Sequence, residues 1–171
     1  MSRLALGVLS LLTIGACGTD TAIDADRSGD GDAPPDGSMM PADGAGRPIP
    51  DASLDPVCDQ AKLHSDFAWL QANVFTPSCA TAMCHSGTAP AVGLSLAAGA
   101  AYSNLVNKGT STVTGWKRVV PRSIAQSYLV VALGRTAGPA PRDGFMPLGA
   151  GPLCVGKLEA IERWITAGAP P

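Results

Sequence analysis

"TPSCATAMCHSG", residues 76–87, holds two of the chain's five cysteines, Cys79 and Cys84, with His85 directly after the second. A C-x-x-C-H run is typical of covalent haem attachment, which uses two thiols and an adjacent imidazole. Here four residues separate the cysteines. The same segment therefore also suits a local disulfide or part of a zinc site, and the rest of the sequence has to distinguish these three interpretations.

The wider spacing changes how the two thiols can face one ligand. On a regular helix, residues three apart differ by about 300° and share a face, whereas residues five apart lie about 140° out of alignment. Both thiols reach one porphyrin edge only if the two extra residues bulge outward. The intervening Ala80, Thr81 and Ala82 are small, so we expect such a bulge, with Cys84 and His85 keeping their usual places.

A haem held by one histidine needs a second axial ligand, and methionine is a common partner of histidine in such sites. Met146, in "DGFMPLG", follows His85 by 61 residues and precedes Pro147, which restricts the backbone. Met83 is too close to His85 in sequence to reach the opposite face of the ring. Met146 alone would be read as a core residue, but together with the Cys-His pair it is the better ligand candidate.

The N-terminus reads as a targeting signal. Arg3 precedes the apolar run 4–12, which is too short to span a membrane, and "IGAC" ends at Cys17. This pattern resembles the lipobox of bacterial lipoproteins. We expect residues 1–16 to be a signal peptide and Cys17 to be the lipidated N-terminus. The protein would then lie in the cell envelope, anchored to the inner or outer membrane and facing the periplasm or the cell surface.

Residues 17–57 differ in composition from the rest of the chain. From residue 18 to residue 57 there are nine Asp and two Arg, and no aromatic residue. Such a segment buries too little apolar surface to offset its chain entropy. We therefore expect a lipidated, disordered, acidic Asp/Gly/Pro-rich tether, followed by a domain at 58–171 that holds all eight aromatic residues and carries a net charge of +4.

The domain reads as mainly α, with long ordered loops. Apolar residues at helical spacing predict a helix from about Ala61 that Pro77 ends, a helix over 124–134 capped by Ser123, and a last helix over 157–168. A shorter helix is expected around Tyr102, and "TGWKRVVP" reads as extended. The predicted buried faces consist of Leu63, Phe67, Leu70 and Val74, then Ile124, Tyr128 and Val131, then Leu158, Ile161, Trp164 and Ile165. An 18-residue Gly/Pro loop, 135–152, carries Met146.

Lipidation of Cys17 would leave four cysteines in a compartment where disulfides persist. Cys58 and Cys154 are the candidate pair, because a bond between them would tie the start of the first helix to the start of the last. Closing a loop of nearly 100 residues contributes about 4–5 kcal/mol in the chain-entropy model. A second disulfide between Cys79 and Cys84 would instead give a haem-free, stapled binding or structural module.

Other functional classes find little support. The near-neutral overall charge does not suggest nucleic-acid binding, and no G-x-S-x-G, P-loop or H-E-x-x-H motif occurs. A zinc site at Cys79 and Cys84 lacks a second C-x-x-C or H-x3-H pair. Glu159 and Glu162, three residues apart, read as a solvated helix face rather than a catalytic pair.

From Phe75 onward the chain resembles the cytochrome c-type domain of bacterial lipoproteins. The matching pieces, in family order, are "VFTPSCATAMCHSG", "GLSL", "AYSNLV", "RVVPRSIAQSYLVVALG", "MPLG" and "IERWITAGAP". The resemblance implies a small cytochrome c-like fold with covalent haem c. It also implies attachment at Cys79 and Cys84, His85 as proximal ligand and Met146 as distal ligand of the iron. Trp116 and Arg118 are candidates for positions near the haem propionates.

The resulting expectation is a membrane-tethered electron carrier rather than an enzyme. Its redox partner would be a protein, unidentified, which basic surface residues could steer into contact if that partner is acidic. These basic residues include Lys108, Lys117, Arg122 and Arg135. The alternative remains the haem-free module stapled by disulfides.

Overall fold

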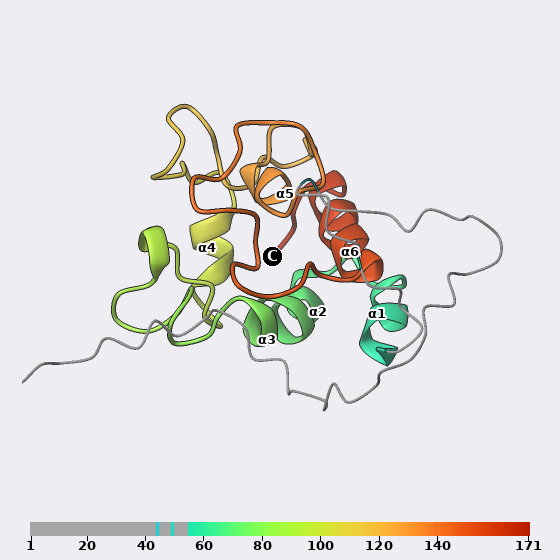
Figure 1. Ribbon diagram of the computed structural model, residues 1–171. Helices are drawn as coiled ribbons and strands as arrows, with labels where there is room; N and C mark the ends of the chain where they lie inside the picture. The colour runs from blue at the N-terminus through green and yellow to red at the C-terminus, as the bar shows by residue number, and fades with distance from the viewer. Residues whose placement is uncertain (1–43, 45–48, 50–54) are drawn as a thin grey trace, which may run out of the picture.

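The computed structural model describes Gly44, Ile49 and residues 55–171 (Figure 1). The predicted signal peptide, the lipidation site Cys17 and most of the predicted tether lie outside the described residues. Within the described part of the chain, no helix has both the length and the apolar character needed to cross a membrane.

The described chain is mainly helical, as predicted. Its elements in order are α1 (Pro56–Ala61), α2 (Phe67–Leu70), the π-helix η2 (Gln71–Phe75), α3 (Thr76–Ser78), the 3₁₀-helix η3 (Ala91–Gly93), α4 (Ala101–Leu105), α5 (Tyr128–Ala132) and α6 (Val155–Thr166). Residues 55–171 contain no β-strand. The stretch predicted as extended contributes only isolated bridges, such as that between Gly109 and Lys117.

The first predicted helix is two helices, and the prediction that Leu63 is buried is wrong. Leu63 lies in the turn between α1 and α2, with 87% of its surface exposed. The Asp66 side chain starts a new helix here, because it accepts a hydrogen bond from the Trp69 backbone amide at 2.8 Å. The apolar spacing therefore holds from Phe67 onward but not before it.

Pro77 does not end the second helix where predicted. It lies within α3, and the helix continues to Ser78. A proline inside a helix has no amide to donate, and the turn before it is a π-helix in which the Thr76 amide donates to the Gln71 carbonyl. The wider turn accommodates the proline within the helix, and the cysteine motif follows directly after α3.

The helix predicted over 124–134 is shorter, and Ser123 does not cap it. α5 begins at Tyr128 after Ser127, whose hydroxyl donates to the Ser123 carbonyl at 2.6 Å. The same hydroxyl accepts from the Val120 amide at 2.9 Å. These bonds hold residues 120–127 in a compact turn, so Ile124 precedes the helix instead of joining it.

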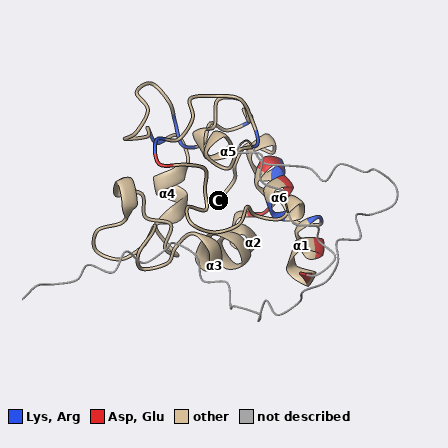
Figure 2. Cartoon of the chain, viewed as in Figure 1, with Lys and Arg blue, Asp and Glu red and all other residues tan. Residues whose placement is uncertain are grey.

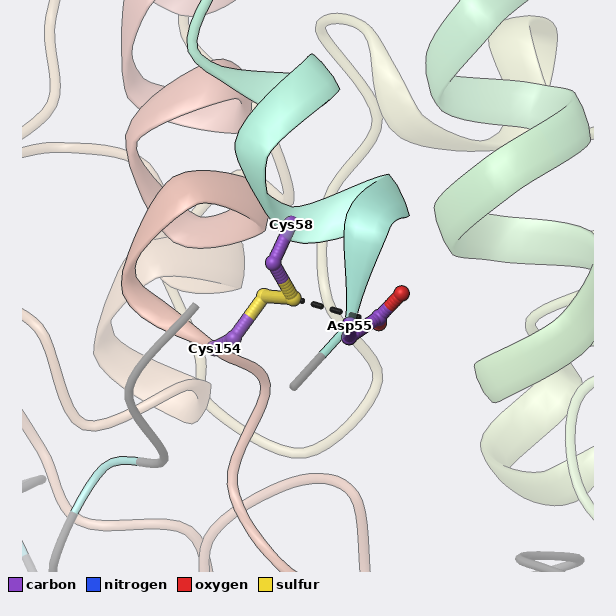
Figure 3. A group of neighbouring side chains, drawn as sticks. All are labelled: Asp55, Cys58 and Cys154. Carbon is purple, nitrogen blue, oxygen red and sulfur yellow. Dashed lines mark hydrogen bonds between the residues drawn. A yellow bond between two sulfur atoms is a disulfide. The ribbon is translucent and has the colours of Figure 1, made fainter. Parts of the chain in front are cut away.

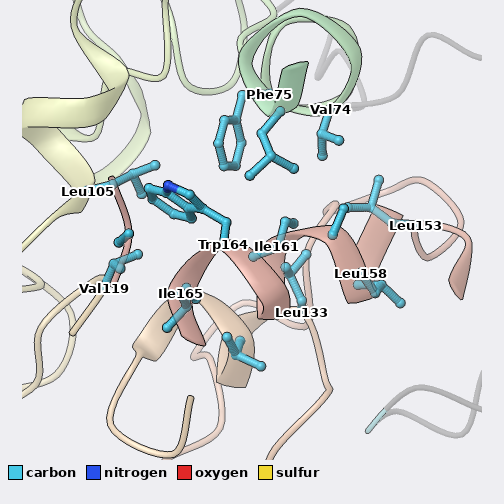
Figure 4. Packing of buried hydrophobic residues seen from close by; sticks show 14 of the residues in the cluster. Val74, Phe75, Leu105, Val119, Leu133, Leu153, Leu158, Ile161, Trp164 and Ile165 are labelled. Carbon is cyan, nitrogen blue, oxygen red and sulfur yellow. The ribbon is translucent and has the colours of Figure 1, made fainter. Parts of the chain in front are cut away.

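α6 is the one long helix of the described chain, and its buried face is the predicted one. Leu158, Ile161, Trp164 and Ile165 are each at most 1% exposed. Trp164 reaches from α6 toward Leu105, as Figure 4 shows, and its indole N–H donates to the Pro170 carbonyl at 2.7 Å. The core cluster therefore joins α6 to α2, η2 and α4, and to the loop before α5.

The packed domain begins upstream of the predicted boundary at Cys58. α1 starts at Pro56 with Asp55 as its N-cap, and Asp55 accepts from the Val57 amide at 2.9 Å. Ile49, inside the segment interpreted above as a tether, is fully buried in the core cluster. An isolated isoleucine in an acidic, Pro-rich stretch gives no periodic signal, so sequence reasoning placed it outside the domain.

The predicted disulfide between Cys58 and Cys154 is present, with a Cα–Cα distance of 6.2 Å. Cys58 lies in α1 and Cys154 is the N-cap residue of α6, so the bond joins the two helices (Figure 3). Asp55 lies beside it, and its carboxylate accepts a hydrogen bond from Lys157 at 3.1 Å. With both sulfurs in a disulfide, this Asp-Cys-Cys group offers no thiolate to a metal.

Candidate functional site

The cysteine motif folds as a tight loop after α3. The His85 amide donates to the Cys79 carbonyl at 3.1 Å and the Cys84 amide donates to the Thr81 carbonyl at 3.0 Å. Between the cysteines, Ala80 packs against the core cluster, whereas Ala82 is exposed and Met83 is 68% exposed. The segment therefore bulges at Ala82 and Met83, while the use of both cysteines by one site stays a prediction.

His85 is buried and oriented by the backbone that follows it. Its Nδ1 lies 3.2 Å from the Leu94 carbonyl oxygen, and its own carbonyl accepts from the Leu96 amide at 2.7 Å. A carbonyl can only accept, so this contact requires the proton on Nδ1 and leaves the Nε2 lone pair available. Burial lowers the pKa of His85, which further favours the neutral imidazole.

The two motif sulfurs differ in state. Cys79 is a half-buried free thiol, and burial raises its pKa to about 12, so it stays protonated at neutral pH. Cys84 is buried and disulfide-bonded, with a partner outside the described residues. The Cys79–Cys84 disulfide of the stapled-module hypothesis is therefore not formed. His85 is not the exposed polar residue that this hypothesis expected.

A cavity brings the motif together with the long loop before α6. It contains about 1150 Å³ of empty space, counting the part open to solvent. Cys79, Cys84 and His85 line it from the motif, and Met146 lines it from the 135–152 loop. The four residues predicted as cofactor ligands thus face one space. The remaining walls are largely apolar, with Leu94, Leu96, Leu105, Leu129 and Leu133 among them.

The loop that carries Met146 is fixed to α5. The Met146 amide donates to the Ala132 carbonyl at 2.8 Å, and Met146 packs against the core cluster while half-exposed to the cavity. The following Pro147 is buried and also lines the cavity. The side chain is thereby presented from a defined backbone position, as the Met-Pro sequence suggested.

One of the two proposed propionate neighbours lines the cavity. Arg118 does, and it donates from Nη1 to the Asn104 carbonyl at 2.9 Å. Burial lowers its pKa, yet a guanidinium remains charged at neutral pH. Trp116 is not among the lining residues. It packs edge-on against Tyr128, and Tyr128 lines the cavity.

Sequence reasoning missed two features of this site. Arg142 and Asp143 also line the cavity, and their place three to four residues before Met146 in the Gly/Pro loop was the available signal. The carbonyl of Leu94 orients His85, and no sequence pattern marks a backbone acceptor nine residues away. Comparison of the chain with known protein families, with curated proteins and with solved structures gives no match.

Proposed function

We propose that the cavity holds a covalently attached haem c and that the protein carries single electrons outside the cytoplasm, tethered to a membrane through Cys17. The observation that carries the proposal is the donor set. Two cysteine sulfurs, an imidazole with its Nδ1 already engaged and a thioether all line one largely apolar space. This combination suits haem iron better than zinc or calcium, which favour thiolate-rich or oxygen-rich ligands.

The residues present fit the group on chemical grounds. A metal-binding histidine usually donates its second ring N–H to a carbonyl or carboxylate, and Leu94 supplies that acceptor to His85. Cys79 and Cys84 would hold the porphyrin through thioether bonds, which requires both sulfurs as reduced thiols, so the disulfide of Cys84 would have to be reduced before attachment. Met146 would complete the axial pair from the opposite loop, and Arg118 supplies a cation for a propionate.

When bound, haem supplies a one-electron iron couple whose potential depends on axial ligands and burial. The chain's own residues exclude water through the leucine walls, orient His85 and keep it neutral, and place Met146 on a loop fixed to α5. We assign no substrate chemistry to the cavity. The redox partner would be a separate protein.

The test is periplasmic expression together with a cytochrome c maturation system. We expect a coloured protein whose haem stays with the polypeptide after denaturation and acidic extraction. The pyridine haemochrome band should indicate two saturated vinyl groups in the natural chain and one in the Cys79→Ser variant. Haem that is extracted, or a colourless protein whose mass matches the bare polypeptide, would contradict the proposal. The second result would favour a haem-free binding module, which shares the Cys58–Cys154 bond.

A further inference from the structure

Charge is distributed unevenly over the described residues. Four pairs of Lys or Arg with a carboxylate are present, and each involves α1, α6 or a residue capping them: Lys62–Asp59, Lys157–Asp55, Arg135–Glu162 and Arg163–Glu159. In Figure 2 blue and red accordingly lie close together on α6, and red marks the acidic residue of α1. Elsewhere in residues 55–171, basic side chains have no carboxylate within 4.0 Å.

Two of these unmatched cations line the cavity, and two more are backbone neighbours of one of them. Arg118 and Arg142 line it. Lys108 and Lys117 are exposed and adjoin Arg118, since the Arg118 amide donates to the Lys108 carbonyl at 2.7 Å and Lys117 precedes it. We call these four residues the cationic rim. Among the described residues, Asp143 is the one acidic residue lining the cavity, so the rim keeps an excess of positive charge there.

The same chain carries a segment of opposite charge. Residues 18–43 contain seven Asp and one Arg. Gly44, which follows them, lies against the loop that carries Met146. A Cβ added at Gly44 would be 3.2 Å from the Phe145 ring and 3.2 Å from the Gly134 backbone. Phe145 stands between Gly144 and Met146, which both line the cavity.

We propose that the acidic segment 18–43 binds the cationic rim within the same molecule and competes there with acidic partner proteins. A chain spans at most about 3.5 Å per residue, so the eight residues from Asp36 to Asp43 reach roughly 25 Å from Gly44. Covalent linkage gives the segment an effective concentration on the order of millimolar. Contacts between exposed charges weaken with salt, so the binding is strongest at low ionic strength.

The experiment uses a zero-length carbodiimide, which couples a carboxylate to an amine only where the two touch. The protein, purified with its N-terminal segment, is treated at about 0.01 M and about 1 M salt and mapped by mass spectrometry. We expect amide links from Asp20–Asp43 to Lys108 and Lys117 at low salt, and few at high salt. Lys157, which is paired with Asp55 on the side of α1 and α6, is the control lysine and should show few links to this segment.

Mixing light and isotopically heavy protein distinguishes contacts within a molecule from contacts between copies. Links within one isotope support the proposal, whereas mixed links would assign the rim to a second copy and overturn it. No link at low salt, or links spread evenly over Lys108, Lys117 and Lys157, would also overturn it. A variant with all seven Asp of 18–43 changed to Asn should bind a polyglutamate probe severalfold more tightly than the natural chain. Equal affinity would contradict the competition.

Discussion

The two sides of this domain are built differently. On the side of α1 and α6, a disulfide joins the helices, Arg163 donates to the Ala61 carbonyl at 2.6 Å, and the cations are matched by carboxylates. On the cavity side, turns and loops over 79–96, 108–118 and 135–152 carry the sulfurs, the imidazole and unmatched cations. The disulfide and the ion pairs thus lie on one side, and the candidate site lies on the other.

The largest effect should come from the disulfide. Changing both Cys58 and Cys154 to Ser removes a cross-link across a sequence separation of 96 and should lower the free energy of unfolding by about 4–5 kcal/mol. Urea unfolding of the haem-free protein measures this. Cys79→Ser, on the cavity side, is the control and should cost less than about 1 kcal/mol. Equal losses would mean that the two sides do not differ as described.

Next comes the packing of the second helix. Leu70 is fully buried, so Leu70→Ala should cost about 2–5 kcal/mol in the free energy of unfolding. Leu63→Ala removes the same atoms from a side chain that is 87% exposed. It should change the free energy of unfolding by less than about 0.5 kcal/mol. Thermal or urea unfolding of the pair decides whether the helix breaks at Asp66. A large loss for Leu63→Ala would restore the single long helix that the apolar spacing predicted.

A smaller effect is expected where α1 and α6 touch. A Cβ at Gly156 would collide with the Cys58 carbonyl oxygen, so Gly156→Ala should cost about 1–3 kcal/mol through displaced backbone. Gly151→Ala, in the loop just before α6, meets no atom within 4 Å and should be neutral. Differential scanning calorimetry of both variants tests this close approach. A neutral Gly156→Ala would show that the two helices can separate without loss.

The smallest effect is a pH dependence that originates on the cavity side. Burial lowers the folded-state pKa of His85 from its ordinary value of 6.5, so the unfolded chain binds this proton more readily. The contribution of the neutral imidazole to stability is therefore complete above pH 6.5 and is lost as the pH falls below it. Unfolding of the haem-free protein between pH 7.5 and 5, compared with His85→Gln, measures it. A decline of the same size in His85→Gln would assign the effect to another group.

Sequence reasoning was most reliable where one local pattern determines the outcome. The buried face of α6 follows from helical spacing, and the Cys58–Cys154 pair follows from counting cysteines in a chain that we expected to be exported. The grouping of His85 with Met146 rested on the chemistry of haem ligands rather than on local structure. The cavity places both residues on one lining, while the haem itself stays a prediction.

The sequence failed where a side chain or a distant backbone group overrides the local pattern. Asp66 restarts the helix and exposes Leu63, and the hydroxyl of Ser127 delays α5. Ile49 joins the core from a stretch whose composition otherwise indicates no core at all. Each of these outcomes depends on a specific contact. Periodicity and composition carry no information about such contacts.

A comparison of two methionines tests the proposed haem ligation most directly. Met146 and His85 line the same cavity, whereas Met83 lies in the motif but is 68% exposed. Optical spectra of matured protein carrying Met146→Ala or Met83→Ala report the axial ligands of the iron. We predict that Met146→Ala loses the low-spin spectrum of a His/Met pair and that Met83→Ala keeps it. If both variants keep the natural spectrum, Met146 is not the ligand that we propose. If the natural chain matures without haem, the proposed function is wrong.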